Sequence, residues 1–269
     1  MSTRKEFAGS RLKIERAKHH INDLHTQIGG IAVSSLYTLR IDTNAQTGND
    51  VLRVEFSQFL PPLEDFALII GDALHNLESA MDYAVNEVVF RRLGSHDDYT
   101  KFPFRSTREN LIAAINGALV YKASKAVSDF IVNVAQPYEG GNDPLWAFND
   151  MNNVDKHRLL IPVLHIKLIS RIRLQNDRGD VHISSQAMHP GRRLFRRELN
   201  GRNYKITDNG TPSILILFAK GSTREGEAVL PTLRQFTEIV SGLVEGIERV
   251  FFAEERETVD DSPRISQKA

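Results

Sequence analysis

One stretch of the chain carries side chains that could do chemistry, and they recur at regular spacing. Between residues 61 and 93, apolar residues follow a helical period, and five short polar residues step by three and four: Asp72, His75, Ser79, Asp82 and Asn86. An α-helix turns about 100° per residue, so these five side chains share one narrow stripe. Asp, Asn and Ser are poor interior helix formers. The stripe therefore indicates that these groups serve a purpose beyond solubility.

A second polar stretch, residues 152 to 158, lies near the end of a helix expected over residues 143 to 160. Asn152 and Asp155 share a side with apolar residues of that helix, and a buried polar group needs a partner. The stripe on the central helix is the largest supply of such partners, and Gly71 beside it would allow two helices to approach closely. We therefore expect the two stretches to meet.

The first chemical interpretation is phosphodiester cleavage. His75 and His157, on facing helices, would act as general acid and base, and Lys156 or Arg158 would hold the phosphate. We expect the catalytic groups to be His75, His157, Asp72 and Asp155. We expect the substrate-binding groups to be Asn76, Asp82, Asn153, Lys156 and Arg158.

Two further interpretations use the same region. A divalent metal ion would be bound by Asp72, His75, Asp155 and His157, as helix pairs bind metals in bundles. A serine hydrolase would use Asp72, His75 and Ser79, and it ranks last because the sequence has no nucleophile elbow or oxyanion hole. The alternative to all of this chemistry is a buried hydrogen-bond network that cross-links two helices.

The two stretches resemble an uncharacterised bacterial family that shares a GDxxHNLxSAxD helix and a later NxxDKHR segment. The matching residues are Gly71 to Asp82 and Asn153 to Arg158, accompanied by Phe102-Pro103-Phe104 and Gln136-Pro137-Tyr138. The resemblance covers about half of the chain and implies no particular activity. Glu78 stands where that family is expected to have Arg, so a cation is missing there.

A looser resemblance is to the HEPN helical-bundle ribonucleases, whose motif is an Arg followed by four to six residues and a His. In this chain Asn152 or Asn153 stands where that Arg belongs, and His157 matches the His. The resemblance implies metal-independent RNA cleavage, in which the Arg holds phosphate and the His transfers a proton. RNA or a phosphate-containing ligand is the partner implied.

Composition excludes several classes of protein. Lys plus Arg equal Asp plus Glu at 34 each, so no global field attracts nucleic acid or acidic membrane. The absence of cysteine excludes disulfides, a thiol nucleophile and Cys-ligated metals. No apolar stretch is long enough to cross a bilayer. We expect a cytoplasmic protein without a membrane partner, and a homodimer is one alternative for its assembly.

The pattern of periods predicts an α+β fold, in which an antiparallel helical bundle packs with an antiparallel β-sheet. The bundle is expected from helices near residues 10–28, 61–93, 143–160 and 231–252, and the sheet from a hairpin at 37–56 and strands within 163–219. Residues 1–252 would form a single domain and 253–269 a disordered tail. A cluster of arginines, at 192, 193, 196 and 197, suits either a solvated loop or a phosphate-binding patch.

Overall fold

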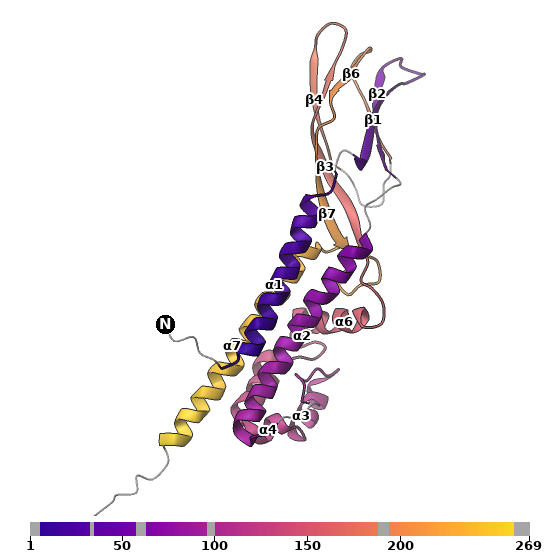
Figure 1. The fold of residues 1–269 in the computed structure, drawn as a ribbon. Coiled ribbons are helices and arrows are strands. Elements are labelled where there is room, and N and C mark those ends of the chain that lie inside the picture. The colour runs from indigo at the N-terminus through magenta and orange to yellow at the C-terminus, as the bar shows by residue number, and fades with distance from the viewer. Residues whose placement is uncertain (1–5, 33–34, 58–62, 96–99, 188–193, 261–269) are drawn as a thin grey trace, which may run out of the picture.

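The structure, a computed structural model, describes residues 6–32, 35–57, 63–95, 100–187 and 194–260 (Figure 1). The helices are α1 (Ala8–Gly29), α2 (Leu63–Leu93), α3 (Arg108–Asn116), α4 (Leu119–Ala123), α5 (Lys125–Phe130), the π-helical turn η2 (Ile131–Ala135), α6 (Asp143–Asp155) and α7 (Val229–Asp260). The strands are β1 (Tyr37–Thr43), β2 (Asp50–Phe56), β3 (Pro162–Gln175), β4 (Val181–Ala187), β5 (Leu194–Glu198), β6 (Lys205–Asp208) and β7 (Thr211–Phe218). The expected α+β class is confirmed. No helix among the described residues has the length and apolar character needed to cross a bilayer.

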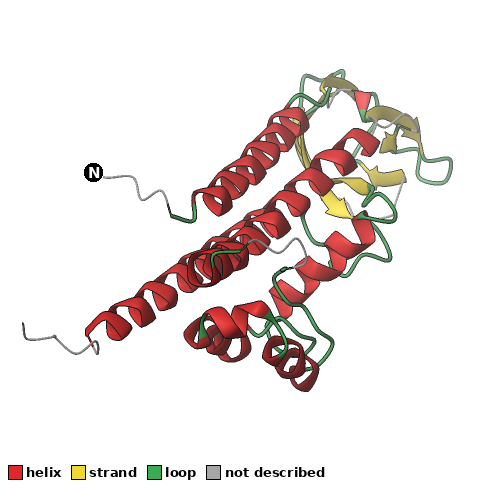
Figure 2. Ribbon diagram, turned by 60° about the horizontal axis from the view of Figure 1, so that its bottom comes forward, coloured by secondary structure: helices red, strands yellow, loops and turns green. Residues whose placement is uncertain are grey.

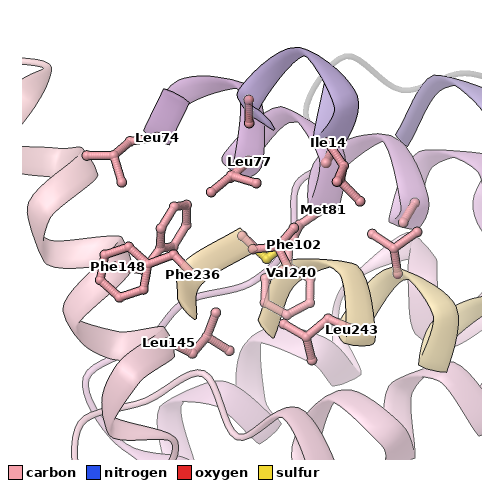
Figure 3. Packing of buried hydrophobic residues seen from close by; sticks show 14 of the residues in the cluster. Ile14, Leu74, Leu77, Met81, Phe102, Leu145, Phe148, Phe236, Val240 and Leu243 are labelled. Atoms are coloured by element: carbon pink, nitrogen blue, oxygen red, sulfur yellow. The ribbon is translucent and has the colours of Figure 1, made fainter. Parts of the chain in front are cut away.

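The long helices α1, α2 and α7 pack together into a helical body (Figures 1 and 2). The shorter helices α4, α5 and α6 lie against α2 or α7, and α3 lies against α4 and η2. Their apolar stripes, spaced by three and four residues, meet in one core (Figure 3). At its centre Leu77 of α2 lies near Phe148 of α6 and Phe236 of α7, and the two phenylalanine rings meet edge to face at 5.5 Å. This core fixes α6 against α2.

Two antiparallel sheets form an arm beyond one end of α1 and α2 (Figure 1). One sheet has the order β1-β2-β5, and the other has the order β4-β3-β6 with β7 paired to the first part of β3. A second apolar core lies between them, and side-chain hydrogen bonds join the two sheets. Tyr37 Oη donates to the carbonyl of Asn209 at 2.8 Å, and Arg197 Nη1 donates to Ser184 Oγ at 2.9 Å.

Strand β3 connects the arm to the body. Its first part pairs with β7, and Leu164 of β3 packs against the helical core together with Ile216 and Phe218 of β7. Its second part pairs with β4 and β6, and there Ile172 and Leu174 belong to the arm core. Since β3 begins seven residues after α6 ends, the position of α6 determines where the arm starts.

Three segments differ from the sequence expectations. Helix α6 ends at Asp155 rather than near residue 160, because the chain turns at residues 156–158 and then alternates between exposed and buried residues into β3. Residues 194–198, where the arginine cluster suited either a solvated loop or a phosphate-binding patch, form the edge strand β5 on β2. Helix α7 continues to Asp260, so residues 253–260 are helical rather than a disordered tail. Residues 261–269 lie outside the described part of the chain.

Contacts of Glu254 explain why α7 continues beyond residue 252. The Glu254 carboxylate accepts hydrogen bonds from Ser124 Oγ at 2.6 Å and from the backbone N–H of Ala126 at 3.1 Å, and it lies 3.6 Å from Arg92. These contacts join α7 to the first turn of α5 and to the end of α2. A charged residue that looked like the start of a tail therefore serves as an anchor.

Two glycines one turn apart in α7 test how tightly this helix packs. A Cβ at Gly246 would collide with the ring of Phe130 on α5, whereas a Cβ at Gly242 would meet nothing. Gly242→Ala should therefore raise the free energy of unfolding by about 0.5–1 kcal/mol through helix propensity. Gly246→Ala should lower it by about 1–3 kcal/mol through overpacking. Urea unfolding of both variants checks this, and equal stabilisation by both would contradict the packing of α5 on α7.

Candidate functional site

The two polar stretches come together where the end of α6 reaches α2. Gly71 of α2 lies directly under the Asp155 carboxylate, because a Cβ at this position would collide with both oxygens and the carboxyl carbon. Glycine costs about 1 kcal/mol relative to alanine inside a helix. The close approach of Asp155 explains why α2 has this glycine.

His75 and Asp155 form a partly buried pair. His75 Nε2 lies 3.5 Å from Asp155 Oδ2, and the Asp155 side chain is 6% exposed whereas the His75 side chain is 44% exposed. Burial raises the pKa of Asp155, while the His75 charge and a backbone hydrogen bond from Leu160 act in the opposite direction and Asp72 adds to the increase. The pair therefore presents one imidazole edge to a buried carboxylate and the rest of the ring toward solvent.

One turn further along α2, Glu78 pairs with Lys156, whose Nζ lies 2.7 Å from Glu78 Oε1. Burial alone would raise the pKa of Glu78, but the Lys156 hydrogen bond, the nearby Asn152 amide and the charges of Lys156 and Lys101 lower it below its ordinary value. Asn152 is only 1% exposed, and neither atom of its amide reaches a hydrogen bond of normal geometry with a described residue. Lys156 is thus the cation in contact with the Glu78 carboxylate, and the charge of Lys101 adds to its effect.

Asp82, one turn beyond Glu78, receives a hydrogen bond from the backbone N–H of Phe102 at 2.8 Å. Burial raises the pKa of Asp82 to about 6, and the Glu78 charge adds to the increase. The Phe102 hydrogen bond and the charges of Lys101 and Lys156 act in the opposite direction without offsetting the burial. Asp82 is therefore a carboxylate with little compensation for the solvation that it loses.

The next polar residue of the stripe also holds the segment around Phe102. Asn86 Nδ2 donates to the carbonyl of Thr100 at 2.7 Å, and the ring of Phe102 is buried in the helical core. Arg105 then bridges to Tyr138 through the backbone hydrogen bond from Arg105 N–H to Pro137 O at 3.2 Å. The stripe on α2 thus contacts α6 and the segment at Phe102, and the end of that segment pairs in turn with Pro137 and Tyr138.

Other residues expected at the site lie elsewhere. Asn153, His157 and Arg158 are exposed, and none of them makes a hydrogen bond or ion pair with a described residue of α2. His157 follows the end of α6, so the expectation of facing helices for both histidines does not describe its position. Asn76 Nδ2 donates to the carbonyl of Asp72 within its own helix at 2.7 Å.

The residues expected to bind a metal are not assembled. Within the described ranges, no three His, Asp or Glu side chains form a group that could hold a metal ion. Of the four expected ligands, Asp72, His75, Asp155 and His157, the structure pairs only His75 with Asp155. The divalent metal ion therefore stays a prediction from the sequence.

The two described arginines of the cluster, Arg196 and Arg197, lie next to each other on strand β5 and have different surroundings. Arg196 lies opposite Arg53 of β2, which lies opposite Arg40 of β1, and Arg53 is ion-paired with Asp42 and Glu55. The next position of the cluster, Arg197, donates inward to Ser184 instead. The cluster members at 192 and 193 lie outside the described residues. Arg197 thus makes a hydrogen bond within the protein, and Arg196 lies in a row of arginines in which Arg53 is paired with carboxylates.

Sequence reasoning missed Glu78 and Lys101 as members of the site. Glu78 had been noted only for standing in place of Arg, although the opposite charges of Glu78 and Lys156 in the two motifs were a usable signal. Comparisons with known proteins give no match for the chain, whether with family models, with curated proteins or with solved structures. The candidate site is therefore interpreted from its own geometry.

The raised pKa of Asp82 predicts a pH-dependent stability. A carboxyl group whose pKa is about 6 in the folded protein and 3.8 otherwise stabilises the fold fully below pH 3.8, and this contribution is lost as the pH rises through about 6. Asp82→Asn should therefore raise the free energy of unfolding at pH 7.5 by about 1–3 kcal/mol, and by less at pH 5. Urea unfolding at both pH values measures this.

The control for Asp82 is Asp23→Asn, which changes an exposed aspartate on α1. It should leave the pH dependence of unfolding unchanged. An Asp82→Asn protein that is less stable than the parent at pH 7.5 would show that the ionised carboxylate is well compensated where it lies.

The close approach at Gly71 predicts coupling between α2 and α6. Gly71→Ala should lower the melting temperature despite its better helix propensity, because the new methyl group displaces the Asp155 carboxylate. In the Asp155→Ala background the same change should be neutral or stabilising. We expect a coupling free energy of about 1–3 kcal/mol from the double-mutant cycle. An equal effect of Gly71→Ala in both backgrounds would contradict the contact.

Proposed function

We propose that this chain is a non-catalytic binding or scaffold protein, in which the polar contacts between α2 and α6 fix the sheet arm on the helical body. The observation that carries this proposal is the ion pair between Lys156 and Glu78. The phosphodiester-cleaving interpretation used Lys156 or Arg158 to hold the phosphate, and of these Lys156 instead neutralises a carboxylate of its own protein, while Arg158 is exposed and has no described contact with α2. The lysine is therefore used to hold α6 on α2.

The remaining contacts of the site support the same function. Asp155 lies over Gly71, and Asp82 and Asn86 hold the backbone at Phe102 and Thr100. Each contact joins segments that are distant in the sequence, which is what a cross-linking network does. The network includes most of the polar stripe on α2.

Helix α6 is also held from its other side. The carboxylate of Asp150 accepts a hydrogen bond from Thr223, and Asp143 lies 3.4 Å from Arg224, both in the loop between β7 and α7. Arg224 is shared with Glu227 of the same loop at 3.2 Å. Because β3 begins seven residues after α6 ends, contacts on both sides of α6 set the direction in which the arm leaves the body.

A second candidate function is supported by the pair of His75 and Asp155. A buried carboxylate beside a half-exposed imidazole is the arrangement that orients a histidine for proton transfer. This candidate is metal-independent cleavage of RNA with His75 as the acid–base group, whereas the HEPN resemblance itself rests on His157, which is exposed. It lacks a described cation in contact with His75, and for this reason it ranks below the scaffold.

The two functions make different predictions for the two histidines. Under the scaffold proposal, His75→Ala should lower the melting temperature by several degrees, corresponding to about 1–2 kcal/mol, because it removes the partner of a buried carboxylate. His157→Ala is the matched control, since His157 is exposed, and it should change nothing. Thermal unfolding followed by circular dichroism measures both.

The same proteins are then incubated with single-stranded RNA in EDTA. The scaffold proposal expects no cleavage by the parent protein or by either variant. Metal-independent cleavage that disappears in His75→Ala while the melting temperature stays unchanged would refute the scaffold proposal and establish the second candidate.

A further inference from the structure

Strand β4 is an edge strand of the sheet arm. In the order β4-β3-β6 it pairs only with β3, and its backbone makes no hydrogen bond with any other described segment. Its outer face carries two aliphatic side chains, Val181 at 55% exposure and Ile183 at 59%. The opposite face is turned toward the arm core, where Ser184 is buried. The β4 edge is thus both apolar and open along the described backbone.

Edges of this kind are normally protected against pairing. The usual devices are charged residues, especially lysine, a proline, or a β-bulge that twists the edge away. The seven residues of β4, Val-His-Ile-Ser-Ser-Gln-Ala, contain no Lys, Arg, Asp, Glu, Pro or Gly. The bulge in this pair of strands lies in β3, where Arg171 has a φ of 59°, and leaves β4 regular. None of the three devices is present on β4.

We propose that the β4 edge binds the β4 edge of a second copy of this chain in antiparallel register around Ser184. This inference concerns the arm and is independent of the function of the α2–α6 contacts. A two-fold axis at Ser184 places Ile183 opposite Ser185 of the second copy and Val181 opposite Ala187. The pairing joins two four-stranded sheets edge to edge and is isologous, as in most homodimers.

The absence of charge on β4 and its self-complementary sequence favour a second copy of this chain as the partner. Like charges that lie directly opposite across two strands destabilise the pairing. A strand with like charges at positions related by the two-fold axis would repel its own copy, but β4 has no Lys, Arg, Asp or Glu. The exposed aliphatic residues meet small side chains, Ser185 and Ala187, so the two outer faces fit without a clash. A second copy therefore meets no repulsion along the whole strand.

The size of the contact sets the expected affinity. Pairing of two seven-residue strands buries less surface than the roughly 1,200–2,000 Å² typical of stable complexes. Self-association should therefore depend on concentration within the range from about 1 µM to about 1 mM. Sedimentation velocity of the full-length chain across this range should show a reversible monomer–dimer equilibrium.

A single charge on the edge should remove this association. Ile183 lies opposite Arg173 of β3, so Ile183→Glu adds a favourable pair within the monomer but places two glutamates diagonally across the two-fold axis. We expect dimerisation to weaken by about tenfold or more. The matched control is Leu12→Glu, which makes the same kind of change at a 70% exposed residue of α1 and should leave the equilibrium unchanged.

The register is tested by disulfide cross-linking, because the chain has no cysteine of its own. Residues directly opposite in an antiparallel pair have Cα atoms about 4.5–5.5 Å apart, within the range that a disulfide spans. A mixture of Ile183→Cys and Ser185→Cys proteins should therefore cross-link faster than either protein alone. A chain that is monomeric at about 1 mM, a dimer insensitive to Ile183→Glu, or cross-linking without preference for the mixture would each overturn the proposal.

Discussion

The contact that positions α6 is made by the buried carboxylate of Asp155 and the backbone of α2 at Gly71, which has no side chain. Asp155 extends to Gly71 of α2, where any larger residue would exclude it. Burying a charged group is unfavourable unless it is paired, and here the partners are His75 and the backbone N–H of Leu160. Because these partners come from α2 and from the segment between α6 and β3, the carboxylate is stabilised only when both lie against the end of α6.

This constraint extends from the helical body to the arm. The chain leaves α6 at Asp155, turns, and enters β3, which first packs on the helices and then carries β4 and β6. A 14-residue strand that belongs to both cores transmits the orientation of one to the other. The polar contacts beside Gly71 therefore influence the orientation of the sheet arm, although they lie in the helical body.

Periodicity predicted the elements and the meeting of the two polar stretches, but it could not predict contacts made by irregular backbone. The stripe on α2 and the close approach at Gly71 were both readable, since helical spacing defines faces. Strand β5 was missed because arginines occupy both of its faces, which hides the alternation: Arg196 is exposed on the outer face, whereas Arg197 donates to Ser184 across the arm. The helical residues after Phe252 were missed because Glu254 is held by partners on α2 and α5, which no local pattern reveals.

Three carboxylates of the site, each partly buried, have different compensation, and this difference indicates what the site is for. Glu78 is paired with a lysine, and its pKa is lowered. Asp155 lies beside a histidine and a backbone N–H, and Asp82 accepts chiefly one backbone N–H. The pKa of both aspartates is raised, because these partners do not offset burial. A site under selection for stability alone would replace Asp82 and Asp155 with apolar residues, since buried charges rarely stabilise more than well-packed side chains. Their directional contacts instead specify one position for α6 and one for the segment at Phe102. Under the scaffold proposal, this precision in joining body and arm is what the polar stripe contributes.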